Sequence, residues 1–281
     1  MAFALARILP ALAVAVALFA GPAPNACAQE EVPFITSPDN VTLEMLRIAN
    51  VGPGDHVIDL GSGDGRIVIL AAKRFNATGL GVEIVPELVQ RSIRAARDAG
   101  VGERVSFLEQ DLFKTDLSAA TVVTMYLLPD VNLQLRASLL ALKPGTRIVS
   151  HDWDLGDWKP DRTVVVPVPD KKVGLEKSSN VHLWVVPAQV EGLWCGAGLL
   201  RGTSLRLSQH YQAFEGTLRF LQRSRPLQGR IEGRTLRTPG GRAGELVLEF
   251  KQERLQIVQA AGPLALARGR SFNRAKGPDC S

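Results

Sequence analysis

The sequence has little cysteine, methionine, tyrosine or histidine, and it contains no exact repeat and no low-complexity segment. Its 281 residues include three Cys, three Met, two Tyr and four His. Its His and Cys residues do not recur at the spacing of a metal-ligand set, so we expect no metal site. Outside Ile8–Ala20 there is no long apolar run, and that run is too short to predict a transmembrane helix. The apolar share of 46% and the charged share of 22% predict an ordinary globular protein with a sizeable core.

The N-terminus has the layout of a secretory signal peptide. Met1–Arg7 carries one positive charge and no acid, an apolar run follows, and the small residues Ala26-Cys27-Ala28 precede Gln29. This pattern predicts a signal peptide over residues 1–28 and an exported protein, periplasmic or membrane-associated. An uncleaved anchor and a cytoplasmic protein remain alternatives. Pro24-Asn25-Ala26 is a poor lipobox, which disfavours lipidation of Cys27.

Cleavage after Ala28 leaves two cysteines, Cys195 and Cys280. A pair of cysteines in an oxidising compartment is a disulfide candidate. The bridge would close a loop of about 85 residues and contribute about 3–4 kcal/mol. Two unrelated thiols are the alternative.

Apolar strands alternate with helical patterns through residues 29–187. Such alternation predicts βαβ units, and hence an α/β fold with a doubly wound, mostly parallel, seven-stranded Rossmann-like sheet. The last two strands have no helix between them, which predicts a closing hairpin. The expected strands are His56–Leu60, Thr78–Glu83, Val105–Leu108, Thr121–Leu127, Arg147–Ser150, Thr163–Val168 and Val181–Val186, and the expected helices are Pro38–Ala49, Ile67–Phe75, Pro86–Ala99 and Val131–Leu142.

Residues 188–281 follow a different pattern. Short alternating stretches such as Ser204–Leu207 and Glu245–Phe250 are separated by turns, which predicts a small antiparallel β domain, a barrel or a sandwich. This part holds 15 Lys and Arg against 7 Asp and Glu, whereas residues 29–187 hold 17 against 21. The basic domain is a candidate for contact with an anionic envelope surface. A soluble β domain with cationic outer faces is the alternative.

The segment Val57–Arg66 carries the strongest functional signal. An apolar strand runs into Asp59, and then Gly61, Gly63 and Gly65 occupy alternate positions. A dinucleotide loop has the spacing G-x-G-x-x-G and receives an anionic pyrophosphate. Here the third glycine comes one residue early, and Asp59 and Asp64 would repel a pyrophosphate. They suit a positively charged ligand such as S-adenosylmethionine, which has an ammonium and a sulfonium.

Two more acids follow strands and converge on the same crevice. Glu83 ends the second strand, where a carboxylate can accept both ribose hydroxyls of an adenosine. Asp111 follows the third strand, where it can accept from the adenine amino group while its apolar neighbours pack on the ring. One strand-end acid is commonly a solvated turn residue, but three around a G-x-G-x-G loop indicate a methyl-donor site.

These residues resemble class I S-adenosylmethionine-dependent methyltransferases. Together with Pro33-Phe34 and Trp158-Lys159-Pro160, they are similar to the group that contains the mitochondrial lysine N-methyltransferase of the ATP synthase c-subunit. The resemblance covers residues 33–187 and implies a methyl acceptor beside Pro33, Phe34 and Tyr126. It implies that the cofactor-binding residues are Asp59, Gly61, Ser62, Gly63, Gly65, Glu83, Asp111 and Leu112.

Methyl transfer is an in-line displacement that depends on alignment, and a lysine acceptor must arrive deprotonated. Tyr126, His151 and Asp152 are weak candidates for a catalytic group. Tyr126 is equally well a core residue, and His151-Asp152 equally well a turn. Trp153 and Trp158 could border the acceptor entrance, although packing beneath a loop is the commoner role of such residues.

The sequence therefore favours an active methyltransferase, acting most plausibly on protein lysine, with a small-molecule acceptor as the alternative. Because the donor is made in the cytosol, an exported protein that binds an adenosyl ligand without turnover is a second hypothesis. A surface-interaction protein that uses the basic β domain is a third.

Overall fold

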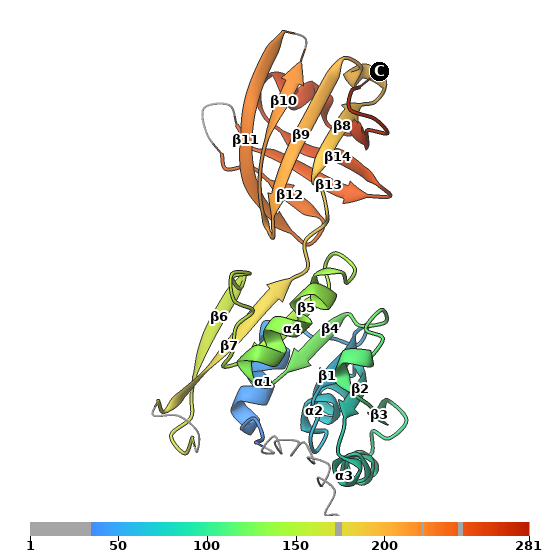
Figure 1. Ribbon diagram of the computed structural model, residues 1–281, viewed down its shortest axis with the longest axis vertical. Helices are drawn as coiled ribbons and strands as arrows, with labels where there is room; N and C mark the ends of the chain where they lie inside the picture. Colours follow the sequence, from blue (N-terminus) through green and yellow to red (C-terminus); the bar gives the residue numbers. More distant parts are fainter. Residues whose placement is uncertain (1–34, 172–175, 221, 241–243, 281) are drawn as a thin grey trace, which may run out of the picture. The chain divides into compact units, whose positions relative to one another are not determined.

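The structure is a computed structural model that describes residues 35–171, 176–220, 222–240 and 244–280. From Ile35 on, the chain forms one compact unit that contains two β-sheets (Figure 1). Pro33, Phe34 and the expected signal peptide lie outside the described residues. The first sheet and its helices comprise α1 (Asp39–Ile48), β1 (His56–Leu60), α2 (Arg66–Phe75), β2 (Thr78–Glu83), α3 (Pro86–Asp98), β3 (Val105–Glu109), η1 (Leu112–Lys114), β4 (Val122–Met125), α4 (Pro129–Leu140), β5 (Arg147–His151), β6 (Arg162–Pro167) and β7 (Ser178–Val185).

The first sheet has seven strands in the order β3-β2-β1-β4-β5-β7-β6. Strands β1 to β5 are parallel, and β7 runs antiparallel to both β5 and β6. The strand order reverses direction beside β1, so the ends of β1 and β4 border the crevice where doubly wound folds bind ligands. The expected fold and the closing hairpin are both confirmed.

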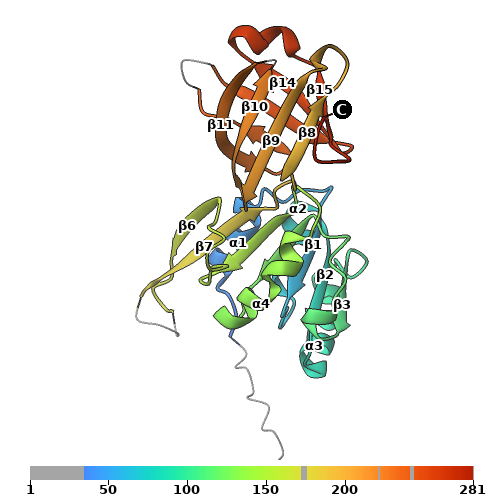
Figure 2. The ribbon, with the colours of Figure 1, turned by 45° about the horizontal axis from the view of Figure 1, so that its top comes forward.

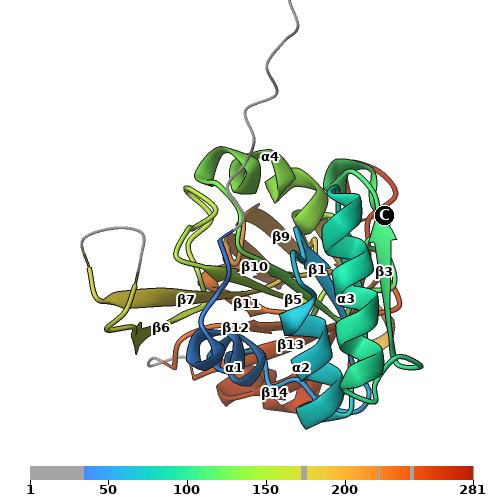
Figure 3. The ribbon, with the colours of Figure 1, turned by 90° about the horizontal axis from the view of Figure 1, so that it is seen from below.

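Alternate residues of the central strands enter two separate cores. Val57 and Val122 pack with α1 and α2, whereas Ile58 and Val123 pack on the opposite face with Leu135 of α4. Because successive side chains of a strand point to opposite faces, a strand buried on both sides is apolar throughout. Figure 3 shows α4 on one side of β1 and β5, with α1 and α2 on the other.

The second sheet is a closed antiparallel barrel (Figure 2). Its interior is filled by alternating apolar side chains such as Leu205, Leu207 and Leu218. Trp194 of the first barrel strand, β8, belongs to the same core. Cys195 and Cys280 form a disulfide, which confirms the proposed pairing. Its elements are β8 (Gly192–Gly196), η2 (Gly198–Leu200), β9 (Thr203–His210), β10 (Ala213–Phe220), β11 (Arg223–Glu232), β12 (Thr235–Arg237), β13 (Leu246–Lys251), β14 (Arg254–Ala260), η3 (Gly262–Ala267) and β15 (Ser271–Arg274).

Two strand ends differ from the expected ones and change the setting of candidate residues. Strand β4 ends at Met125, so Tyr126 follows the strand instead of lying in it, and α4 already begins at Pro129. Proline fits the first helical turn and keeps the residue before it extended, which explains the early start. Strand β5 includes His151, because that residue pairs with Val181 of β7.

Candidate active site

The glycine-rich loop after β1 adopts a backbone that requires glycine. Gly61, Gly63 and Gly65 all have positive φ angles, between 54° and 77°. A Cβ on Gly65 would lie 2.5 Å from the ring of Phe107, so a side chain there would displace β3 as well as strain the turn. Ser62 Oγ is buried against Gly81 of β2, with no hydrogen-bond partner among the described residues.

Asp59 is buried beneath this loop with only 2% of its surface exposed. The hydroxyl of Thr124, its register partner on β4, donates to Asp59 Oδ1 at 2.7 Å. Burial raises the pKa of the Asp59 carboxyl to about 7, and the nearby charges of Glu83 and Asp64 act in the same direction. A ligand cation in the crevice would therefore stabilise the ionised form of Asp59.

Asp64, the second acid of the loop, is occupied by the chain itself. The Arg66 guanidinium donates from Nε to Oδ1 at 2.9 Å and from Nη2 to Oδ2 at 2.7 Å. This pairing holds the pKa of Asp64 below its usual value, although burial opposes it. The two loop carboxylates therefore have different surroundings, and the attraction for a cation argued from sequence belongs to Asp59 alone.

Glu83 connects the end of β2 to the glycine-rich loop. Its Oε2 accepts the N–H of Gly63 at 2.9 Å, and its Oε1 accepts the N–H groups of Ile84 and Val85 at 2.8 and 3.1 Å. These three bonds use three of the about four lone-pair sites of the carboxylate, and Oε2 keeps a further one for a ligand hydroxyl. The residue expected to hold a ribose thus also fixes the loop that borders it.

Asp111 caps the short helix η1. Its Oδ1 accepts the N–H of Phe113 at 3.0 Å, and Lys114 Nζ lies 3.6 Å from Oδ2. Leu112 beside it is half-buried, while Phe113 and Ile84 are exposed at the ends of β3 and β2. The apolar neighbours expected for an adenine ring are present at this edge of the sheet.

On the acceptor side, His151 lies at the centre of a buried cluster. Its Nδ1 is 2.7 Å from Ser37 Oγ, its Nε2 is 2.9 Å from Ser179 Oγ, and its ring stacks on Tyr126 with centroids 3.9 Å apart. Burial lowers the pKa of His151 to about 4, with Asp152 opposing the shift and Lys171 supporting it. Both ring nitrogens are engaged inside the protein, so this residue is not placed to take a proton from an acceptor.

Asp152 is also engaged within the fold. It has a positive φ of 62°, its Oδ1 accepts the N–H of Asn180 at 2.9 Å, and its Oδ2 pairs with Lys171 at 2.8 Å. The Tyr126 side chain is half-buried, and burial together with the Asp152 charge raises its pKa, so its hydroxyl stays protonated. Among the three catalytic candidates, Tyr126 is the one best placed to meet a substrate.

The two tryptophans considered for the acceptor entrance have different positions. Trp153 is exposed just after β5. Trp158 is fully buried, stacks near Tyr211 of the barrel, and accepts the indole N–H of Trp184 at its carbonyl. Trp158 is a packing residue between the two sheets, and only Trp153 can border an acceptor.

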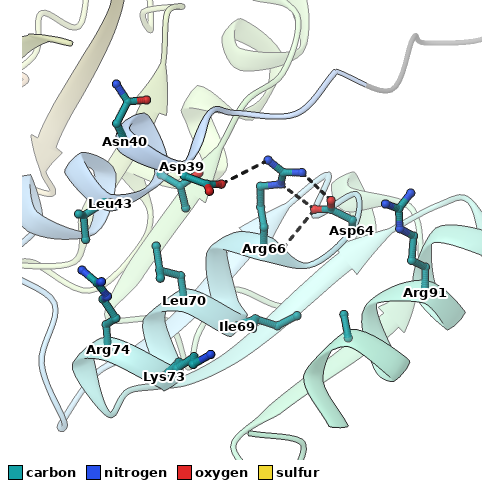
Figure 4. A pocket seen from close by; sticks show the side chains of 12 residues that line it. Asp39, Asn40, Leu43, Asp64, Arg66, Ile69, Leu70, Lys73, Arg74 and Arg91 are labelled. Carbon is teal, nitrogen blue, oxygen red and sulfur yellow. Dashed lines mark hydrogen bonds and ion pairs between the residues drawn. The ribbon is translucent and has the colours of Figure 1, made fainter. Parts of the chain in front are cut away.

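A hollow of about 550 Å³ lies on the outer side of α2, between α1 and α3 (Figure 4). Asp64 and Arg66 belong to its rim, but Asp59, Gly63 and Glu83 do not. Arg66 also donates to the carbonyl of Ser37 at 2.9 Å and lies 3.9 Å from Asp39. The hollow is thus distinct from the cofactor crevice, and Arg66 links the crevice loop to the segment that enters α1.

Comparison with known proteins identifies the family. The family model of the ANTKMT methyltransferase domain matches residues 59–162. A protein-lysine N-methyltransferase of Saccharolobus islandicus is 44% identical over 157 residues, which is 55% of this chain and 94% of that protein. The chain belongs to this methyltransferase family.

Two further relatives differ in how much of their own length is matched. The mouse lysine N-methyltransferase of the ATP synthase c-subunit is 33% identical over 47% of this chain, which spans about half (53%) of that protein. A solved structure of an RNA methyltransferase from Salinibacter ruber, in complex with S-adenosyl-L-homocysteine, is 47% identical, with a TM-score of 0.50 over 56% of this chain and 96% of that one. The protein is an S-adenosylmethionine-dependent methyltransferase, as the sequence predicted.

The residues present fit this cofactor. The loop between Gly61 and Gly65 brings backbone to the crevice, the Asp59 carboxyl is suited to a cation, and Ile84 offers an exposed apolar surface after Glu83. Sequence reasoning missed Thr124, Ser37 and Ser179. Thr124 could have been predicted from the sequence, because it lies opposite Asp59 on the neighbouring parallel strand. Ser37 precedes α1, and that helix has no side-chain cap.

Proposed function

We propose that this methyltransferase modifies the side-chain amine of a protein lysine. The support is the 44% identity to a protein-lysine N-methyltransferase, nearly all of which is matched. A ribonucleic acid acceptor is the second candidate, because the Salinibacter ruber relative is described as an RNA methyltransferase. A small-molecule acceptor is the remaining alternative.

When bound, S-adenosylmethionine would supply an activated methyl group on a sulfonium, which the lysine nitrogen would take as the sulfide leaves. In the proposed assignment, Glu83 and the backbone of Gly61–Gly65, with Ser62 among them, would orient the donor, and Asp59 would supply a negative charge for its ammonium. Asp111 and Leu112 would border the adenine. Orientation of this kind supplies much of the acceleration in a displacement reaction.

The acceptor side favours a neutral amine. Tyr126 and Trp153 give this side apolar surface, which disfavours the charged ammonium. The Tyr126 hydroxyl oxygen can accept an amine N–H, which would turn the nitrogen lone pair toward the methyl group. Because its pKa is raised, the hydroxyl stays neutral and brings no charge to the acceptor. The stacked His151 ring and its two serine partners hold Tyr126 in place, so His151 acts as a positioning residue.

The acceptor is tested with labelled methyl donor and two substrates, an envelope-protein extract and total RNA. Mass spectrometry should find methyl groups on lysine in the protein fraction, whereas label confined to RNA would refute the lysine assignment. Tyr126→Phe should lower kcat roughly ten-fold and leave donor affinity unchanged, since it removes one oriented hydrogen bond. Tyr211→Phe is the matched control, because Tyr211 hydrogen-bonds Asp157 in another part of the fold and should have normal kcat.

We also propose that the protein acts outside the cytoplasm. The signal-peptide pattern of residues 1–28 and the Cys195–Cys280 disulfide both support export, and we assign residues 29–187 and 188–281 as the two mature domains. No helix among the described residues is long and apolar enough to cross a membrane. N-terminal sequencing should give Gln29 as the first residue; an intact Met1 with a reporter active only in the cytoplasm would contradict export.

The basic barrel is the part proposed to contact an anionic envelope component. Its net charge of +8 contrasts with −4 for residues 29–187. Positive surfaces of this kind attract phosphate-bearing partners and lose that attraction as salt rises.

A further inference from the structure

The barrel has two chemically different ends. Every neighbouring pair of its strands is antiparallel, so consecutive hairpin connections alternate between the ends. The β8–β9, β10–β11, β12–β13 and β14–β15 connections therefore share one end. We call the described residues 197–202, 220, 222–223 and 261–270, which belong to three of these connections, the barrel tip. Figure 2 shows the red η3 segment and the golden β8–β9 connection at this end.

The barrel tip carries the exposed large apolar side chains of the described part of the barrel. Leu266 is 94% exposed, Leu199 is 77% exposed and Phe220 is 49% exposed. They come from three different connections, while the apolar side chains of the strands between them are buried inside the barrel. A single exposed leucine needs no explanation, but three apolar residues gathered at one end of a domain indicate an interaction surface.

Each of these apolar residues is accompanied by arginine. Arg201 follows Leu199, Arg223 follows Phe220, and Arg268 and Arg270 follow Leu266. The four arginines are exposed, and their side chains form no ion pair or hydrogen bond with the described residues. In the β12–β13 connection at the same end, Arg237 pairs with Glu245, and at the opposite end Arg274 pairs with Glu253. The barrel tip is therefore apolar at its extremities and positively charged around them.

We propose that the barrel tip docks on the surface of an anionic phospholipid bilayer. The three apolar side chains would enter the boundary between headgroups and acyl chains, and the arginines would meet the phosphates. This inference rests on the proposed envelope contact of the barrel, and it names both the face and the partner. A nucleic acid or an acidic peptide would satisfy the arginines but would leave Leu199 and Leu266 in water, so the bilayer fits both features.

The test uses the chain beginning at Gln29, with the full-length chain measured in parallel. Binding is measured by co-sedimentation with vesicles of phosphatidylcholine containing phosphatidylglycerol, and with vesicles of phosphatidylcholine alone. The tip variant Leu199→Ser/Phe220→Ser/Leu266→Ser should lose about ten-fold in partition coefficient per residue, because each change removes most of one buried apolar side chain. Replacing Arg201, Arg223, Arg268 and Arg270 by glutamine should cost about five-fold per arginine at low salt.

A matched control separates docking by the barrel tip from general attraction to a basic protein. Arg206, Arg234, Lys251 and Arg254 are exposed cations outside the barrel tip, and their replacement by glutamine removes the same charge. This control should bind vesicles within a few-fold of the parent. Equal losses in both charge variants, or parental binding by the apolar variant, would overturn the proposal while leaving a diffuse envelope contact standing.

Two further outcomes are decisive. Retention on heparin or RNA with no retention on vesicles would overturn the bilayer as partner. Binding of S-adenosylmethionine should be the same in every variant, since the barrel tip contains none of the cofactor-binding residues. Parental donor binding shows that the methyltransferase part of a variant is folded, and vesicle binding can then fail without any failure of the proposed lysine activity.

Discussion

Replacing Asp59 by asparagine should stabilise the protein without ligand while weakening the binding of the methyl donor. Asp59 is 2% exposed, and its carboxyl has a pKa raised to about 7 from the ordinary 3.8. Asparagine has the same shape, and its carbonyl oxygen can accept the Thr124 hydroxyl as Oδ1 does now. The substitution therefore removes the ionisation of the side chain and little else.

The sign of the effect follows from the raised pKa. Between pH 4 and 7 the folded protein holds a proton on Asp59 that the unfolded chain releases, so the free energy of unfolding falls as pH rises through this range. A pKa raised by roughly three units corresponds to about 4 kcal/mol at 1.36 kcal/mol per unit. The free energy of unfolding of the asparagine variant does not fall in this way. It should exceed that of the parent by an amount that grows from near zero at pH 4 to about 4 kcal/mol at pH 8.

The assay is urea unfolding of parent and variant at a series of pH values, without ligand. Taking the difference between the two proteins cancels every other titrating group that they share. Asp64→Asn is the control of opposite sign, because Arg66 lowers the pKa of Asp64 and its ionised form stabilises the fold at neutral pH. An advantage of the Asp59 variant that stays constant from pH 4 to 8 would refute a raised pKa at this position.

The same charge is predicted to matter for binding. An ammonium in the crevice favours ionised Asp59, so binding of the donor to the parent near pH 6 should release a proton. Calorimetry in buffers of different ionisation enthalpy measures this release, and Asp59→Asn should abolish it. A donor affinity unchanged in the variant would mean that Asp59 does not interact with the cofactor.

The remaining predictions concern single contacts. Gly65→Ala should abolish donor binding, because its Cβ would overlap an aromatic ring of β3, whereas Gly52→Ala, with open space around its Cβ, should bind normally; equilibrium dialysis checks both. Cys280→Ser should lower the unfolding free energy by about 4 kcal/mol, measured in urea, since Cys195 and Cys280 lie 85 residues apart; equal stability with and without reductant would contradict it. His151→Asn should remove an acid sensitivity of about 3 kcal/mol between pH 6.5 and 4, because burial lowers the His151 pKa to about 4 and the unfolded chain takes up the proton first; denaturation curves at the two pH values measure it.

The cofactor side of the site was predictable because its residues are set by local sequence. Strand and loop patterns placed Asp59, Glu83 and Asp111 at the ends of successive parallel strands, and parallel strands end at one edge of a sheet. The positive φ angles of the three glycines follow from the turn between β1 and α2. Local sequence did not show which of the two loop acids is neutralised within the protein. Arg66 forms an ion pair with Asp64, whereas Asp59 has no such pair among the described residues.

The acceptor side was less predictable because it depends on contacts between distant segments. Ser37 meets His151 across 114 positions, and His151 meets Ser179 across 28. The turn considered at His151-Asp152 was an interpretation from local sequence, and the structure shows these long-range pairings of His151 instead. Alternation predicted an antiparallel β domain, either a barrel or a sandwich. Closure into a barrel depends on β15 pairing with β8, the last and first strands of that domain in sequence.

The two sides of the crevice also divide the charges in a way that suits methyl transfer from a cation to an amine. In the proposed assignment, the donor would bring its positive charge to the edge of the sheet where the Asp59 and Glu83 carboxylates lie. The acceptor side must avoid a second cation, because positive charge near the amine and the sulfonium would oppose their approach. A histidine stacked under Tyr126 would supply such a charge if it titrated at its ordinary pKa of 6.5. Burial between two serine hydroxyls keeps the pKa of His151 near 4, so the ring supports Tyr126 as a neutral group throughout the neutral pH range.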